Sequence, residues 1–124
     1  NLARYYAADA YFQLGQYDEA LRYFEAYEKD ADFLGAGALE GQAAIYENRG
    51  EFARAAEQYE RAATHFDNTL TSPRYLLSAG RAYEEAGDLD AARRVYETVR
   101  DDYPDSAPAR EVARHLARVR AQSR

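Results

Sequence analysis

The chain has 124 residues, of which 47% are apolar and 31% are charged, so it is long enough for one domain with its own core. It has no cysteine and only two histidines, which excludes disulfides, thiolate chemistry and histidine-rich metal sites. Its net charge of −6 argues against a nucleic-acid partner, because neutralising phosphates requires a basic surface. No apolar run reaches the length of a membrane span. We therefore expect one domain without metal, cofactor, nucleic acid or membrane span.

An internal repeat becomes visible when three glycines, Gly15, Gly50 and Gly87, are aligned at spacings of 35 and 37 residues. Other positions then agree in kind across the three copies. They are a tyrosine four residues before each glycine, an alanine five residues after it and an aromatic residue nine residues after it (Tyr11, Tyr46 and Tyr83; Ala20, Ala55 and Ala92; Phe24, Tyr59 and Tyr96).

Each aligned glycine predicts the end of one helix and the start of another, since glycine adopts a left-handed backbone without a Cβ penalty. After the first glycine, Ala20, Phe24 and Tyr27 stand at i, i+4 and i+7 and share one helix face. Ser72 and Pro73 predict an N-cap followed by a first-turn proline. The predicted helices cover residues 2–14, 17–30, 34–48, 52–65, 73–86, 89–102 and 106–121.

This pattern resembles the tetratricopeptide repeat (TPR), a unit of about 34 residues with two antiparallel helices, an A-x3-F motif and a closing proline. The motif runs from Ala20 to Phe24 in the first copy, and Pro104 closes the third. The resemblance implies an all-α fold, namely a right-handed α-solenoid of three TPR helix hairpins with a C-terminal capping helix. We expect a single domain over residues 1–124, with units at about 1–35, 36–72 and 73–106 and the capping helix at about 106–121.

The last predicted helix differs from the repeats in its charge. Residues 106–124 contain five arginines and one acid, a balance of +4, which leaves −10 on residues 1–105. Arg110, Arg114 and Arg118 follow one another at four-residue spacing and form a basic stripe. This stripe is either the solvated face of a helix that caps the stack, or a contact surface for an acidic partner or an anionic membrane surface.

The sequence offers little catalytic chemistry. It has no zinc-protease, Walker, EF-hand or G-x-S-x-G motif, and Gly35 and Gly37 do not form a dinucleotide fingerprint because Glu40 replaces its third glycine. His65 is expected at a helix end, where it interacts with the helix dipole. The arginines around His115 oppose its protonation. We therefore expect no enzyme and no catalytic residue.

The TPR resemblance also implies where a partner binds. In that family the first helix of each unit lines a concave groove, through its second, fifth, ninth, twelfth and thirteenth unit positions. In this chain those positions hold Leu2, Tyr5, Asp9, Phe12 and Gln13 in unit one, Gly37, Glu40, Ala44, Glu47 and Asn48 in unit two, and Arg74, Leu77, Arg81, Glu84 and Glu85 in unit three.

The residues of this groove predict the character of the partner. TPR domains that clamp a C-terminal carboxylate use lysine and asparagine in unit one, where this chain has Tyr5 and Asp9. Asp9 and Glu40 would repel an acidic tail. The groove better suits a peptide or helix with basic and apolar residues, anchored on Tyr5 and Phe12. Alternatively, Leu2, Tyr5 and Phe12 are covered by an upstream helix.

Several stretches are similar to bacterial cell-envelope TPR proteins. Residues 13–20 and 103–106 resemble periplasmic adaptors, and residues 67–73 and 75–80 are similar to single-pass proteins related to the ancillary subunit of the SecYEG translocon. That resemblance implies an N-terminal membrane anchor, a periplasmic domain and a role beside the translocon; without it, a cytoplasmic location is expected. A different class of function is structural assembly, in which homo-oligomers form through the exposed solenoid ends and the basic last helix.

Overall fold

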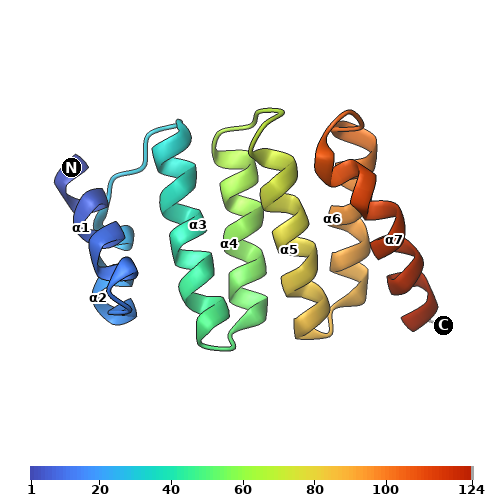
Figure 1. Cartoon of the computed structure of the whole chain (residues 1–124), viewed down its shortest axis with the longest axis horizontal. Helices are drawn as coiled ribbons and strands as arrows, with labels where there is room; N and C mark the ends of the chain where they lie inside the picture. Colours follow the sequence, from blue (N-terminus) through green and yellow to red (C-terminus); the bar gives the residue numbers. More distant parts are fainter. Residues whose placement is uncertain (124) are drawn as a thin grey trace.

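The computed structural model describes residues 1–123, which form seven α-helices joined by short connections (Figure 1). Within that range, no helix combines the length and the apolar character needed to cross a membrane. The helices are α1 Leu2–Gln13, α2 Tyr17–Ala26, α3 Phe33–Asn48, α4 Phe52–His65, α5 Ser72–Ala86, α6 Leu89–Asp102 and α7 Ala107–Gln122.

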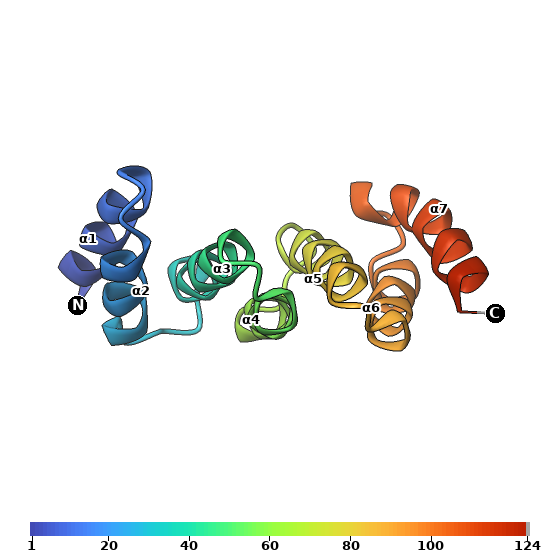
Figure 2. The same ribbon diagram turned by 90° about the horizontal axis from the view of Figure 1, so that it is seen from below.

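The helices are stacked as antiparallel hairpins in two layers. Figure 2 shows α1, α3, α5 and α7 in one layer, which we call the first-helix layer, and α2, α4 and α6 in the other. The turn inside each hairpin passes through a glycine with positive φ: 76° at Gly15, 77° at Gly50 and 82° at Gly87. The glycines that mark the sequence repeat therefore end the first helix of each hairpin, as predicted.

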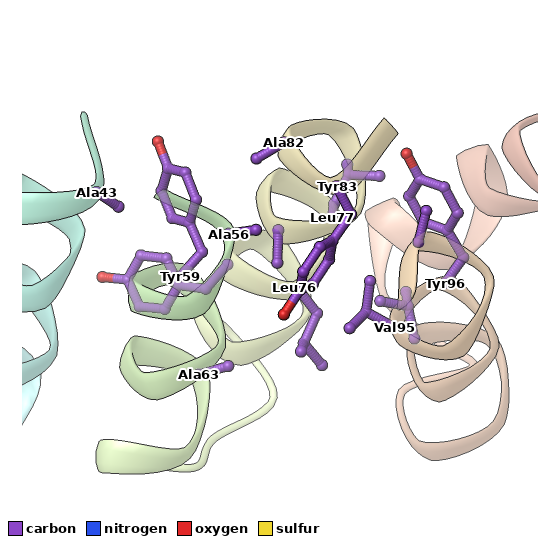
Figure 3. Packing of buried hydrophobic residues seen from close by; sticks show 14 of the residues in the cluster. Ala43, Ala56, Tyr59, Ala63, Leu76, Leu77, Ala82, Tyr83, Val95 and Tyr96 are labelled. Carbon is purple, nitrogen blue, oxygen red and sulfur yellow. The ribbon is translucent and has the colours of Figure 1, made fainter. Parts of the chain in front are cut away.

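Small residues and aromatic rings pack closely between neighbouring helices. One continuous cluster of buried side chains extends from α3 to α7 and includes Tyr59, Leu76 and Tyr96 (Figure 3). A second, smaller cluster joins α1, α2 and α3 around Phe24 and Ala38. The first hairpin thus packs through a core largely separate from that of the later helices.

The second helix is shorter than predicted, because α2 ends at Ala26 rather than near residue 30. Tyr27 is already extended, with φ −67° and ψ 126°. Asn1 forms two hydrogen bonds with the backbone of Glu28, at 2.8 and 2.9 Å. Lys29 Nζ donates to two carbonyl oxygens at the end of the helix, at 3.0 and 3.3 Å. Helical periodicity cannot predict this end, since the contacts that fix it come from side chains outside the periodic face.

The prediction that Ser72 is the N-cap of the fifth helix is wrong. The α5 helix begins at Ser72 itself, and Thr71 precedes it as the N-cap. The Ser72 hydroxyl donates to the carbonyl oxygen of Ala63 at 2.7 Å and accepts from the backbone N–H of Asn68 at 3.0 Å. It therefore closes the connection between α4 and α5. In α7 the serine does cap, because Ser106 accepts a hydrogen bond from the backbone three residues further on.

The last helix closes the stack. It buries Val112, Leu116 and Val119 against the continuous core, at the predicted i, i+4 and i+7 positions. Apart from the end of α2, the predicted helix limits agree with the structure to within one residue. The expected unit boundaries at 35/36 and 72/73 lie within the first turns of α3 and α5.

Candidate functional site

A hollow of about 330 Å³ opens on the first-helix layer between α1 and α3. We call it the N-terminal hollow. Its lining comes from α1 and α3, with one ring each from α2 and α4: Tyr5, Asp9, Phe12, Gln13, Phe24, Gly37, Glu40, Gly41, Ala44 and Tyr59. Seven of these ten residues are predicted groove positions, so the structure brings together parts of the grooves expected for units one and two.

Tyr5 is held in the hollow by other aromatic rings. Its ring packs edge-on against Phe24 and Tyr27, with centroid separations of 6.0 and 5.5 Å. Its hydroxyl oxygen reaches α3 beside Gly37, where a Cβ atom would lie only 3.0 Å away. A Cβ atom at Gly41 would lie 2.6 Å from the ring of Phe24. The missing side chain at Gly41 thus allows the Phe24 ring to close against α3, whereas at Gly37 only the tip of Tyr5 lies close to the helix.

The hollow is acidic. Asp9 is exposed at its edge, and Glu40 is half-buried in its wall. Burial raises the pKa of Glu40, although the positive charge of Arg74 opposes the rise, and no side-chain hydrogen bond from residues 1–123 stabilises this carboxylate. Burial and the negative charges of Asp9 and Glu40 raise the pKa of Tyr5. The site therefore combines phenol rings with carboxylates that the protein leaves largely uncompensated.

The other predicted positions near the middle of the stack lie outside this hollow. Glu47 lies beside the phenol of Tyr59 and, after burial, is the largest cause of the raised pKa of that tyrosine. Asn48 and Arg74 are exposed on α3 and α5. Leu77 is only 7% exposed and belongs to the continuous core, so it presents little surface to a partner.

A second hollow of about 460 Å³ lies between α5 and α7, and we call it the C-terminal hollow. Arg118 forms a bidentate pair with Glu84, at 2.9 and 2.8 Å, and Arg81 Nη2 lies 3.2 Å from Glu111 Oε2. The acids and arginines here neutralise one another. The lining combines the remaining predicted positions with residues of α7: Arg81, Glu84, Glu85, His115, Arg118 and Gln122.

Glu84 connects three helices of the stack. It accepts hydrogen bonds from Tyr96 of α6 and from Arg118 of α7. Burial alone would raise the pKa of Glu84, but these two hydrogen bonds lower it below its usual range. A glutamate of α4 is held in the same way by a tyrosine of α5 and an arginine of α6 (Glu60, Tyr83 and Arg94). Both glutamates thus serve the packing of the stack.

His115 is the buried histidine of α7. Its Nδ1 atom accepts from Arg118 at 2.6 Å, and its ring stacks on Tyr96 with a centroid separation of 5.2 Å. Its Nε2 atom is buried without a hydrogen-bond partner among residues 1–123, and the nearest acid, Glu111, lies 3.7 Å away. Burial, followed by the charges of Arg118 and Arg81, lowers the pKa of His115. The predicted effect of neighbouring arginines is therefore present, but burial is the larger cause.

The predicted basic stripe on α7 is divided in the structure. Arg110 and Arg114 are exposed and form no ion pair within residues 1–123. Arg118 instead turns toward α5, where it binds Glu84. Two of the three arginines therefore remain on the outer surface of the last helix.

Sequence reasoning missed part of the N-terminal hollow. The rings of Phe24 and Tyr59 stand at the repeat position nine residues after the aligned glycine, which the sequence pattern assigns to packing. In the structure both rings pack in the core and also line the hollow. Gly41 had no signal in the repeat, because its role depends on the distance between α2 and α3.

The stacked hairpins, with a recessed surface on one layer, define a helical-repeat scaffold. Among residues 1–123, no group of three His, Cys, Asp or Glu side chains is placed to hold a metal ion. Two family models, both described as tetratricopeptide repeat, match residues 5–70 and residues 74–106. Because the first alone covers more than half of the chain, the chain belongs to the tetratricopeptide repeat family, as its resemblance predicted. Its fold is an all-α solenoid of TPR hairpins. Repeats of this family generally mediate protein–protein interaction and are typically non-catalytic. A comparison with curated proteins found no match.

Proposed function

We propose that this chain is a non-catalytic adaptor that docks a peptide or helix of a partner protein on the first-helix layer. The N-terminal hollow is the observation that best supports this function, because aromatic anchors and polar groups meet there in a recess. Tyr5 and Phe12 are only half-buried and so keep ring surface for a partner. A hollow of about 330 Å³ is small among ligand sites, so it suits one side chain of a longer segment.

The charge of the hollow supports a partner segment with basic and apolar residues. Asp9 and Glu40 line the recess, and the positively charged Arg74 lies outside its lining. Complementary charge favours a basic segment and opposes an acidic one. The apolar residues of the segment would pack on Phe12 and on the ring of Tyr5.

The test is affinity capture of partner proteins with the chain and with a triple variant, Tyr5→Ala, Phe12→Ala and Glu40→Arg. The matched control is Leu70→Ala with Glu57→Arg, since Leu70 is 67% exposed, Glu57 is exposed on α4 and neither residue lines the hollow. We expect the triple variant to lose partners that the chain and the control both retain. Circular dichroism checks that all three proteins are helical. Equal capture by the folded triple variant would contradict the proposal.

A second candidate function is assembly into homo-oligomers through the first hairpin. The observation that favours it is an apolar surface on α1 and the turn after it, where Leu2, Tyr6 and Leu14 are 46%, 60% and 70% exposed. Sedimentation equilibrium of the chain and of a Leu2→Glu, Tyr6→Glu variant separates this candidate from the first. A concentration-dependent mass that the variant abolishes would support it, and a monomer at all concentrations would remove it.

We also propose that the adaptor works in the bacterial cell envelope. The support is the resemblance of residues 67–73 and 75–80 to membrane-anchored periplasmic TPR proteins. The gene sequence upstream of residue 1 provides the test. A hydrophobic segment of about 20 residues there would support a membrane anchor, whereas a catalytic domain would contradict the adaptor role.

A further inference from the structure

The N-terminal hollow has the size and the lining of a pocket for one charged side chain. Its walls come from two neighbouring helices of the first-helix layer, α1 and α3 (Figure 2). Tyr5 and Phe12 supply aromatic surface from α1, and Asp9 and Glu40 supply a carboxylate from each helix. Aromatic faces and carboxylates both attract cations, so the two kinds of wall favour the same ligand.

The carboxylate of Glu40 is not used in a side-chain contact that holds the fold together. Unlike Glu84, which is held by Arg118 and Tyr96, it accepts no side-chain hydrogen bond within residues 1–123. Burial raises its pKa, which means that the folded chain carries this charge at a cost in stability. A cation that entered the hollow would compensate the charge.

We propose that the N-terminal hollow binds the guanidinium group of an arginine in the partner segment, with the Tyr5 ring against its flat face and Asp9 and Glu40 as hydrogen-bond acceptors. This inference deepens the proposed function and rests on it. A guanidinium has five N–H donors in one plane and stacks on aromatic rings, so one group can contact two carboxylates on different helices. A lysine ammonium is a compact, strongly hydrated charge that matches this arrangement less well.

The test begins with selection of peptides that bind the whole chain from a random-peptide library displayed on phage. We expect the selected peptides to share an arginine next to apolar residues. One such peptide is then synthesised with arginine, lysine or citrulline at that position, because citrulline keeps the shape of arginine without its charge. Affinities are measured by isothermal titration calorimetry for the chain and for Glu40→Gln, Phe12→Ala and the matched control Glu57→Gln.

We expect the citrulline peptide to bind the unmodified chain about tenfold more weakly than the arginine peptide does. With Glu40→Gln the difference between the two peptides should be less than about threefold, because this variant already lacks the carboxylate that the arginine charge contacts. Glu57→Gln should behave like the chain. Because the Glu40 charge disfavours the folded state, Glu40→Gln is expected to fold with undiminished stability, which thermal unfolding can verify.

Each other outcome has a distinct meaning. Peptides that need Phe12 but bind equally well with citrulline would overturn the arginine site and leave the proposed function standing. Equal affinity for the lysine peptide would overturn the assignment to a guanidinium. Peptides whose affinity is unchanged by Phe12→Ala and by Glu40→Gln would overturn both the site and the proposed function. A selection that yields no binding peptide would do the same.

Discussion

Gly80 lies where α5 meets the ring of Tyr96 in α6. A Cβ atom at this position would lie 2.2 Å from the ring; both residues are buried, and Tyr96 belongs to the continuous core. We expect Gly80→Ala to lower the free energy of unfolding by about 1–3 kcal/mol, because the ring has no free space to move into. Urea denaturation followed by circular dichroism measures the change.

Gly37→Ala is the matched control, since Gly37 is also inside a helix of the first-helix layer. A Cβ atom there would lie 3.0 Å from the hydroxyl oxygen of Tyr5, the far end of a side chain, and at ordinary contact distance, 3.9 Å, from its ring atoms. Alanine favours the helix over glycine by about 1 kcal/mol. We therefore expect Gly37→Ala to keep or raise the stability, and an equal loss in both variants would contradict the packing argument.

At the scale of helices, the Glu84 carboxylate joins α5 to α7 and gives the cap a pH dependence. Its hydrogen bonds with Arg118 and Tyr96 hold the pKa of Glu84 below its usual range. A lowered pKa stabilises the folded state above the unfolded pKa, about 4.3, and this contribution is lost as the pH falls through the lower folded value.

We therefore expect the free energy of unfolding to fall as the pH drops below about 4.3, and to fall less steeply in Glu84→Gln. At pH 7 the substitution should cost about 1 kcal/mol, a modest figure because Arg118 is partly exposed and solvent screens the pair. Urea denaturation across this pH range, with Glu57→Gln as the control, measures both effects. If the free energy of unfolding falls equally steeply with pH in Glu84→Gln, other carboxylates cause the pH dependence.

The positions of the helices could be predicted from the sequence because they depend on patterns that span only a few residues. The glycine spacing and the i, i+4, i+7 faces locate every helix, because turn geometry and amphipathicity act over a few residues. The end of α2 was not predictable, since Asn1 and Lys29 bind its last turn and the connection that follows it. The role of Ser72 was not predictable for a similar reason, because its hydroxyl donates a hydrogen bond to the carbonyl oxygen of Ala63 on another helix.

The candidate site also has a part that the sequence predicts and a part that it does not. Repeat offsets predict which residues of α1 and α3 face one layer, and so they predicted Tyr5 and Glu40 in the hollow. Offsets do not predict how deeply each position is packed, and Leu77 belongs to the core although its offset matches a groove position. Offsets also do not predict ion pairs: the four-residue spacing places Arg118 in the basic stripe of the last helix, whereas in the structure it binds Glu84.

At the scale of the whole molecule, the stack has two cores of unequal size. The first hairpin packs on α3 through the smaller cluster, which includes Ala8, Phe24 and Ile45, whereas helices α3 to α7 share the larger one. In a repeat stack each unit contacts only its neighbours, so a terminal hairpin has fewer stabilising interfaces than a central one.

We therefore expect amide hydrogens of α1 and α2 to exchange with solvent faster than those of α4 and α5, as hydrogen-exchange mass spectrometry can measure. The N-terminal hollow spans the junction between the first hairpin and α3, so a bound peptide would contact both sides of it. A ligand that binds only the closed junction stabilises it by mass action. Exchange in α1 and α2 should then slow when an arginine peptide is added, and slow less when its citrulline form is added at the same concentration. Equal slowing throughout the chain would instead indicate that binding stabilises the stack as one cooperative unit and that the first hairpin does not open by itself.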